Sequence, residues 1–299
     1  MNQNLSIEQH QVPQQVEKAR LQDYAVGKFE ALPSRKGTKK AIERGRVLVN
    51  GKPGATATWI EGGERLELLP ALARQLPDLD LGLKVLWEDE HLAMVCKPAG
   101  ILTNGNRKFT LENGLTQALK PSAAHNSLPR PLTVHRLDYP TSGAVLIAKT
   151  RAALIRLKRQ FEERKIGKTY LAVAAGDTTL NERLNSPVDG KAAETDLNSL
   201  ESLKSEKYGK LSLLQLHPRT GRRHQLRVQL AQAGCPILGD PDYHLPGLRS
   251  YGNGLYLHAW ELKLQHPITE KPLMVRAPIP FKFRRLFETS IAKLEEKKA

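Results

Sequence analysis

A short loop in the middle of the chain places one carboxylate beside an arginine, among residues that form turns. The loop is His135-Arg136-Leu137-Asp138-Tyr139-Pro140-Thr141-Ser142-Gly143. Proline, threonine, serine and glycine follow the aspartate, so local backbone geometry is expected to hold Asp138 in place. Such an aspartate can cap its own backbone in an Asx-turn. It can also act as a nucleophile, because a covalent intermediate on a carboxylate divides one difficult step into two.

The elements around this loop are predicted to be short strands and one clear helix. The apolar stretch 144–148 directly follows the loop and predicts a strand, as does the apolar stretch 92–95. A helix is predicted to begin near Thr150. The strands do not recur as strand-helix-strand units. Residues 81–287 are therefore expected to form an α+β domain with a mixed, mostly antiparallel sheet.

Four further strings accompany the loop in sequence order. They are Lys97-Pro98-Ala99-Gly100, Lys168-Thr169-Tyr170-Leu171-Ala172, Thr220-Gly221-Arg222-Arg223-His224-Gln225-Leu226-Arg227-Val228 and Gly234-Cys235-Pro236-Ile237-Leu238-Gly239-Asp240. With the loop, which resembles H-R-L-D-x-x-T-S-G, they resemble the motifs of the pseudouridine synthases of the RluA type. One such string alone is uninformative, whereas five in the family's order are specific.

This resemblance implies the rearrangement of uridine in RNA to pseudouridine. The bond from a ring nitrogen to ribose breaks, the base turns, and it rejoins the ribose through a ring carbon. No water, hydride or phosphoryl group enters the balance. The chain accordingly shows no dinucleotide fingerprint, phosphate-binding Gly-rich loop or H-E-x-x-H string. We therefore expect no cofactor, no nucleotide and no metal.

The resemblance also implies a role for each matching residue. Asp138 is implied to be the catalytic aspartate, and whether it attacks the ribose or the base stays open. Arg227 is implied to keep it ionised, because a fixed cation favours the charged form of a carboxylate. Tyr170 is implied to pack on the target base and to assist proton removal. Arg136 is implied to fill the space that the flipped base leaves, which offsets part of the unstacking cost. His135 is expected to take part in RNA binding and base flipping with Arg136, or to orient or fill the loop.

Four positions depart from the family's usual residues. Asn104 stands near where many relatives have a histidine, and Arg223 replaces a small hydroxyl residue. Gln229 and His244 replace the commoner histidine and glycine. These departures bear on substrate choice more than on activity. Arg222 and Arg223 are expected to bind RNA beside the site.

Residues 21–70 are predicted to form a separate basic module. Two helices followed by a small sheet resemble the alpha-L RNA-binding domain of ribosomal small-subunit protein four, although a merely solvated basic helix is the alternative. Residues 1–20 are expected to be a flexible N-terminal segment and 70–77 a linker. Residues 284–299 are expected to form a charged helix that frays into a tail, with 288–299 as the charged C-terminal tail. The cations expected to bind RNA on the second helix of the module are Lys36, Lys39, Lys40 and Arg44.

The composition of the chain indicates a polyanionic partner. The 299 residues include 46 Lys and Arg against 31 Asp and Glu, a net charge of +15. An excess of this size is typical of nucleic-acid binding. No window reaches the apolar length of a membrane span, and the first residues lack the pattern of a signal peptide. Cys96 and Cys235 lie far apart without metal-ligand spacing, which predicts reduced core residues of a cytoplasmic protein.

Three rival functions are less consistent with these residues. A hydrolase triad of His135, Asp138 and Ser142 would need close neighbours to converge, whereas triads gather from distant segments. An inactive RNA-binding assembly factor would have lost its aspartate, tyrosine or arginine, and all three are present. Asp240 and Asp242 are a thin cluster for a metal-dependent nuclease. The sequence therefore favours a monomeric RNA pseudouridine synthase acting on large-subunit ribosomal RNA, with transfer RNA as the alternative.

Overall fold

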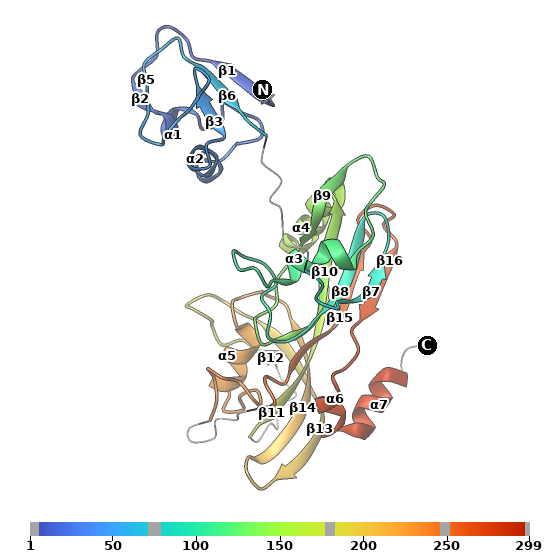
Figure 1. The fold of residues 1–299 in the computed structure, drawn as a ribbon. Helices are drawn as coiled ribbons and strands as arrows, with labels where there is room; N and C mark the ends of the chain where they lie inside the picture. The colour runs from blue at the N-terminus through green and yellow to red at the C-terminus, as the bar shows by residue number, and fades with distance from the viewer. Residues whose placement is uncertain (1–5, 71–78, 177–182, 246–251, 297–299) are drawn as a thin grey trace. The chain divides into compact units, whose positions relative to one another are not determined.

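The computed structural model describes residues 6–70, 79–176, 183–245 and 252–296. It divides into two compact units, Met1–Gln75 and Leu76–Ala299 (Figure 1). Most of the expected linker lies outside the described residues. The units are considered separately below.

The N-terminal unit is a small sheet packed against short helices. The sheet has the order β1-β6-β3-β4, and β2 pairs separately with β5. The core of this unit is apolar and includes Phe29, Ile42 and Leu66. Its elements are β1 (Glu8–Gln11), β2 (Ala19–Arg20), α1 (Leu21–Tyr24), α2 (Arg35–Glu43), β3 (Val47–Val49), β4 (Lys52–Pro53), β5 (Trp59–Ile60) and β6 (Arg65–Leu68).

Local sequence explains the turn in this unit but not its N-terminal strand. Asn50 and Gly51 both have positive φ, 51° and 79°, as the two-residue turn between β3 and β4 requires. In contrast, the segment expected to be flexible before residue 21 supplies β1, which pairs antiparallel with β6, and β2. The expectation for residues 1–20 is therefore wrong where these strands form. Residues 1–5 lie outside the described part.

The second unit is organised by one large sheet. Ten described strands take part, in the order β12-β13-β14-β11-β15-β10-β8-β7, with β16 on β15 and β9 on β10. Among these strands, β10 and β15 make the one parallel pairing, so the expected α+β domain with a mixed, mostly antiparallel sheet is confirmed. The strands are β7 (Lys84–Glu88), β8 (Leu92–Lys97), β9 (Ser127–Thr133), β10 (Ser142–Thr150), β11 (Gly167–Ala175), β12 (Arg183–Leu184), β13 (Thr195–Ser205), β14 (Gly209–Pro218), β15 (Leu257–Gln265) and β16 (Pro272–Arg276).

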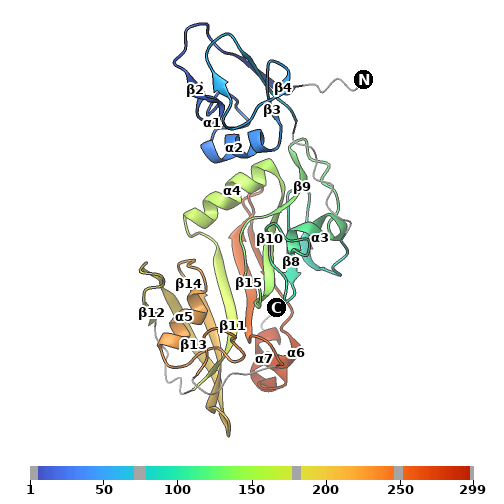
Figure 2. The same ribbon diagram turned by 60° about the vertical axis from the view of Figure 1, so that its left-hand side comes forward.

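Helices cover this sheet and bury both faces of its central strands. Alternate residues of β8 and β10 pack toward α4, with Met94 and Leu146 among them, while Val95 and Val145 pack toward α3. Figure 2 shows α3 beside β8 and α5 beside β13 and β14. The helices are α3 (Leu111–Ala118), α4 (Arg151–Glu162), α5 (Gln225–Gln232), α6 (Phe281–Arg284) and α7 (Glu288–Glu296).

Two expectations about this unit are settled by burial and capping. Thr150 accepts a hydrogen bond from the Ala153 amide and so caps α4, as the sequence indicates. The segment after residue 287 is not a mere charged tail, because Ile291 and Leu294 of α7 are buried in the same core cluster as β11 and β14. Residues 297–299 lie outside the described part.

The close pairing of β10 and β15 fixes where the aspartate loop ends. Gly143 has φ 121°, and an added Cβ there would collide with the backbone of Ala259. Only glycine allows this close approach without strain. The loop that carries Asp138 therefore joins β10 at one defined position, beside Ala259 of β15.

Candidate active site

Asp138 lies in a turn whose backbone is tied to a neighbouring loop. The Thr141 amide donates to the Asp138 carbonyl at 3.1 Å. The Thr103 hydroxyl bonds to both backbone groups of Leu137, accepting from its amide at 3.0 Å and donating to its carbonyl at 2.9 Å. The Asp138 side chain is 23% exposed. The carboxylate is thus held at the surface of the unit while remaining open to a ligand.

Lys97, the first residue of the Lys97-Pro98-Ala99-Gly100 string, connects the loop after β8 to the aspartate loop through hydrogen bonds. Its side chain is fully buried, and Nζ donates to the carbonyls of Pro98, Ile101 and Tyr139. Burial lowers the pKa of Lys97 to about 8, although the charge of Asp138 opposes this shift. Apart from the match of the string itself, no feature near Lys97 in the sequence predicts this role.

Arg227 lies on α5, where it is 1% exposed, and not on a strand surface. Its Nη1 is 3.9 Å from Asp138 Oδ2. Its short bonds go elsewhere: Nε and Nη2 donate to Asp240 at 2.7 and 2.6 Å, and Nη2 donates to Asp242 at 2.7 Å. Burial alone would lower the pKa of Arg227, but the bonds to Asp240 outweigh it and raise this pKa. The expected proximity of Arg227 to Asp138 is present, yet the direct partner is Asp240.

His224 is a site residue that reasoning from the sequence did not single out. It precedes α5 in the left-handed conformation, with φ 55°, which costs a non-glycine residue free energy and is common at functional sites. Its Nε2 lies 3.8 Å from Asp138 Oδ1, and its Nδ1 is 3.2 Å from the Tyr243 hydroxyl. Burial lowers the pKa of His224. In the sequence, the position of His224 within the T-G-R-x-H-Q string was the signal that could have identified it as a site residue.

Tyr170 lies on β11 and packs against two core clusters of the second unit. Burial raises the pKa of Tyr170, and the negative charge of Asp138 adds to this. The phenol therefore stays protonated near neutral pH. The electrostatics oppose the expected help in proton removal and favour the stacking role.

The hydrolase triad does not assemble. His135 accepts a hydrogen bond from the Leu146 amide through Nε2, and its ring lies 5.0 Å from the Phe161 ring. Burial lowers the pKa of His135 to about 3. The Ser142 hydroxyl bonds to Nδ1 of His258, at 2.9 Å. His135 is thus a neutral support for the loop, which argues against the direct role in RNA binding or base flipping that we expected.

The arginines expected to contact RNA are exposed. Arg136 has no hydrogen bond or ion pair to any described residue, so its side chain is available for a ligand. Arg222 donates to the Ala192 carbonyl through Nε and keeps its other donors outward, and Arg223 is exposed as well. On α2 of the other unit, the side chains of Lys36, Lys39 and Lys40 are exposed, as is that of Arg44, the residue that follows this helix.

Three of the departures from the family's usual residues have structural partners. The Asn104 amide donates to the Thr133 hydroxyl. Gln229 is 1% exposed, accepts from the Thr195 hydroxyl and donates to three backbone carbonyls. His244 approaches the neighbouring Leu245 carbonyl. Gln229 therefore holds α5 to the sheet. Arg223 and His244 are the two departures whose side chains are exposed.

A metal site at Asp240 and Asp242 is not supported. Both carboxylates bond to Arg227, and among the described residues no group of three or more His, Cys, Asp or Glu could hold a metal ion. Cys96 is half-buried and Cys235 buried, and both are free thiols. In the described part of the chain, no helix is long and apolar enough to cross a membrane.

Comparisons with known proteins agree with this geometry. The model of the family described as RNA pseudouridylate synthase matches residues 91–232. Ribosomal large subunit pseudouridine synthase D of Xanthomonas campestris pv. campestris is 31% identical over 285 residues, 85% of this chain and 83% of that protein. Ribosomal large subunit pseudouridine synthase C of Vibrio vulnificus is 31% identical over 272 residues, 80% and 83% of the two chains.

A solved structure extends the agreement to the fold. Human RNA pseudouridylate synthase domain containing 1 has a TM-score of 0.55 and 26% identity, covering 67% of this chain and 84% of that one. The resemblance carried by the five strings is thus confirmed by relatives that align with most of their length. On these identities and this fold, the chain belongs to the RluA-type family of RNA pseudouridine synthases.

Proposed function

We propose that this enzyme isomerises specific uridines of large-subunit ribosomal RNA, acting as a monomer and without a cofactor, and that Asp138 is its nucleophile. The relatives named above act, by their names, on the large ribosomal subunit. The observation that carries the assignment is the placement of Asp138 beside Arg227, on a different element, with no described group hydrogen-bonded to its carboxylate.

In the proposed reaction the target base leaves its stack and enters the site beside Tyr170. Arg136, exposed two residues before the aspartate, fills the space left behind. Asp138 then forms a covalent bond to the substrate, either at the ribose or at the base. The bond from N1 to ribose breaks, the base turns and C5 bonds to the ribose. The bond to Asp138 breaks, which regenerates the free carboxylate, and C5 loses a proton while N1 gains one.

The N-terminal unit is proposed to add affinity as an alpha-L-type RNA-binding domain. Its helix α2 buries Thr38, Ala41 and Ile42 and so turns its lysines outward. Exposed cations on one helix suit contacts to phosphates, which supply affinity without reading sequence.

The test has two arms. Chemical mapping of pseudouridine in total RNA from cells with and without the gene identifies the site, and loss of a transfer-RNA site instead would redirect the substrate assignment. Purified enzyme is then given that RNA carrying tritium at C5 of uridine. Wild-type protein should release tritium, whereas Asp138→Asn, which keeps the shape but not the carboxylate, should release none and bind RNA with little change. Clear residual release by Asp138→Asn would end the nucleophile assignment.

A further inference from the structure

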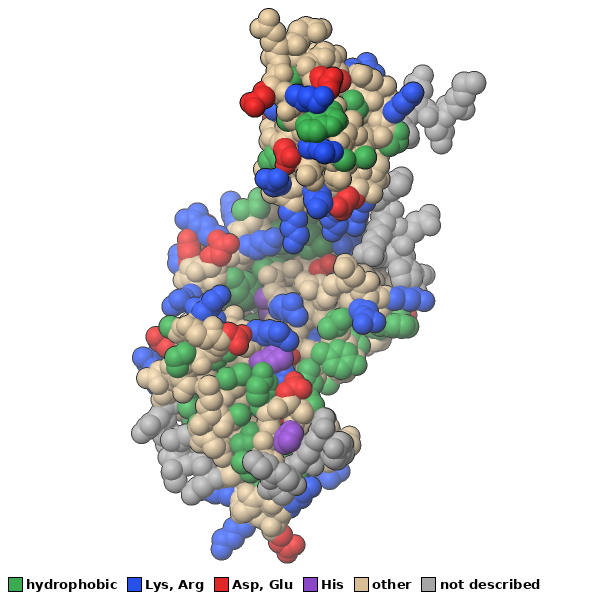
Figure 3. Space-filling model, turned by 90° about the vertical axis from the view of Figure 1, so that its left-hand side faces the viewer, with side chains coloured by type: hydrophobic (Ala, Val, Ile, Leu, Met, Phe, Trp, Pro, Cys, Tyr) green, Lys and Arg blue, Asp and Glu red, His purple; other side chains and the backbone are tan. Residues whose placement is uncertain are grey.

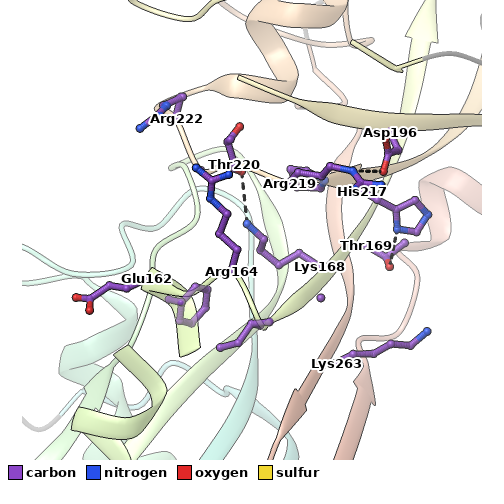
Figure 4. Close-up of a pocket in the computed structure, with 15 residues that line it drawn as sticks. Glu162, Arg164, Lys168, Thr169, Asp196, His217, Arg219, Thr220, Arg222 and Lys263 are labelled. Atoms are coloured by element: carbon purple, nitrogen blue, oxygen red, sulfur yellow. Dashed lines mark hydrogen bonds and ion pairs between the residues drawn. The ribbon is translucent and has the colours of Figure 1, made fainter. Parts of the chain in front are cut away.

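A cavity of about 570 Å³ opens on the second unit without including Asp138 in its lining. It lies between the end of α4, the start of β11 and the segment that follows β14 (Figure 4). Pockets for small ligands span about 300–1,000 Å³. The cavity is therefore large enough for one nucleotide. Of its lining residues, Arg222 is the one that was expected above to bind RNA.

The lining combines positive charge with an apolar floor. Its cations outnumber its carboxylates, and one of the two carboxylates, Asp196, is already paired with Arg219 at 2.7 Å. Figure 3 shows Lys and Arg side chains gathered over this face of the second unit. Phe161 and Ile166 add apolar surface. Such a lining suits a phosphate attached to a flat or apolar group. The five cations are Arg164, Lys168, Arg219, Arg222 and Lys263.

Arg164 stands where the backbone favours glycine. It follows the C-terminus of α4 with φ 57°, and the next amide, of Lys165, donates back to the Gln160 carbonyl at 2.8 Å. Glycine is the usual residue at this position of a helix end. In Figure 4 the side chains of Arg164 and Lys168 extend toward Thr220. The Arg164 side chain has no hydrogen bond or ion pair to any described residue, so its guanidinium is free to bind an anion at the rim.

The cavity shares two chain segments with the aspartate site. Lys168 is two residues before Tyr170 on β11, so both side chains lie on one face of the sheet. Thr220 is four residues before His224, which approaches Asp138. Lys168 Nζ joins the two segments by donating to the Thr220 carbonyl at 3.5 Å. The cavity is therefore connected to the aspartate site through two segments of the chain.

We infer that this cavity binds the phosphodiester and base of an RNA nucleotide that neighbours the target uridine. Arg164 contacts the phosphate, and the apolar floor receives the ribose or base. Lys263, which is paired with Glu261 at 3.0 Å, adds positive charge on the other side of the cavity (Figure 4). The inference rests on the proposed function for the identity of the RNA, but the binding itself can be measured without turnover.

The probe is decauridylate labelled with fluorescein, and its binding to the full chain is followed by anisotropy at several salt concentrations. The cavity variant is Arg164→Gly combined with Lys263→Ala, and glycine is chosen because it tolerates the positive φ. The matched control removes two exposed lysines, Lys204→Ala with Lys207→Ala, at the far end of the β13–β14 hairpin. The cavity variant should lose about tenfold in affinity, with a salt slope smaller by about 0.7 for each phosphate that is no longer bound. The control should lose less than about twofold.

A second variant fills the cavity without changing its charge. Gly221 lines the cavity, and an added Cβ there would meet no heavy atom within 4 Å. Gly221→Leu should therefore weaken binding while leaving the salt slope unchanged. Wild-type affinity in this variant, equal losses in the cavity variant and the control, or no binding by the wild type would each overturn the inference. If the wild type forms no pseudouridine in any RNA while the cavity variant still loses affinity, only the proposed function fails.

Discussion

The pairing of Arg227 with Asp240 makes a quantitative prediction about stability. Asp240 has no exposed side-chain area, and Arg227 is 2% exposed in its side chain. Arg227→Ala would leave a buried carboxylate without its cation, which typically costs about 3–5 kcal/mol. Asp240 Oδ1 keeps two backbone donors, the amides of Asp242 and Tyr243, both at 3.0 Å. Because these bonds remain, we expect Arg227→Ala to lower the free energy of unfolding by about 3 kcal/mol, the lower end of this range.

Two other variants should be much milder. Asp138→Asn removes a carboxylate that is 23% exposed and that lies 3.8 Å from Nε2 of His224 and 3.9 Å from Nη1 of Arg227. Arg159→Ala is the matched control, since Arg159 makes an equally short bond of 2.7 Å to Glu163 but is 76% exposed. Exposed pairs contribute about 0.2–1 kcal/mol. The loss of stability in Arg227→Ala should therefore exceed that in Arg159→Ala by about 2 kcal/mol. The two bonds are of similar length, so this difference comes from burial.

The assay is urea unfolding followed by tryptophan fluorescence in a Trp59→Phe background. The remaining tryptophans, Trp87 and Trp260, both belong to the second unit, so the signal reports that unit alone. Activity is measured below the unfolding midpoint, where Arg227→Ala should still release little tritium. A loss of stability in Arg227→Ala equal to that in Arg159→Ala would refute the view that burial makes the Arg227–Asp240 pair costly to break.

Three further predictions concern RNA and pH. Arg136→Ala should slow turnover on folded RNA more than on a short unstructured strand, where no stack needs opening; equal rate losses on both substrates would contradict base displacement by Arg136. Removal of residues 1–75 should leave a folded second unit whose RNA affinity depends less steeply on salt, by roughly 0.9 for each phosphate that the first unit would have bound, and an unchanged slope would show that the cations of α2 do not touch RNA. Because folding lowers the pKa of Lys97 from 10.5 to about 8, the unfolded state binds more protons between these values, so unfolding free energy should rise with pH through this window. Lys97→Met should flatten that rise, and an identical pH profile in both proteins would disprove the link.

Local chemistry in the sequence was enough to predict much of the second unit. The apolar runs after residues 91 and 143 form buried strands, and Thr150 begins a helix, because these signals depend on near neighbours. The approach of Asp138, Tyr170 and Arg227 followed from the family's motifs. Spacing alone could not have shown it, since the three residues lie on a loop, a strand and a helix that only the tertiary fold brings together.

The elements that escaped prediction depend on distant partners. β1 is Glu8–Gln11, four polar residues with no apolar alternation, and only its pairing with β6 makes it a strand. A charged helix was expected where α7 lies, but its burial was not, because that burial depends on two residues, Ile291 and Leu294, that pack into a core formed by other elements. In the site, neither the turn of His135 toward Leu146 nor the left-handed backbone of His224 has a local cause in the sequence.

The bonds of Arg227 also explain how one arginine can support an aspartate without blocking it. A carboxylate held by two short bonds from a guanidinium has its lone pairs occupied, which favours structure over attack. Here Asp240 takes those short bonds, and Asp138 receives only the nearby charge, 3.9 Å away. No described residue hydrogen-bonds to the Asp138 carboxylate, so its oxygens stay free for substrate. In the sequence, Asp240 and Asp242 looked like a thin metal-binding cluster. In the structure, Asp240 fixes the position of Arg227, the cation that the proposed nucleophile Asp138 needs.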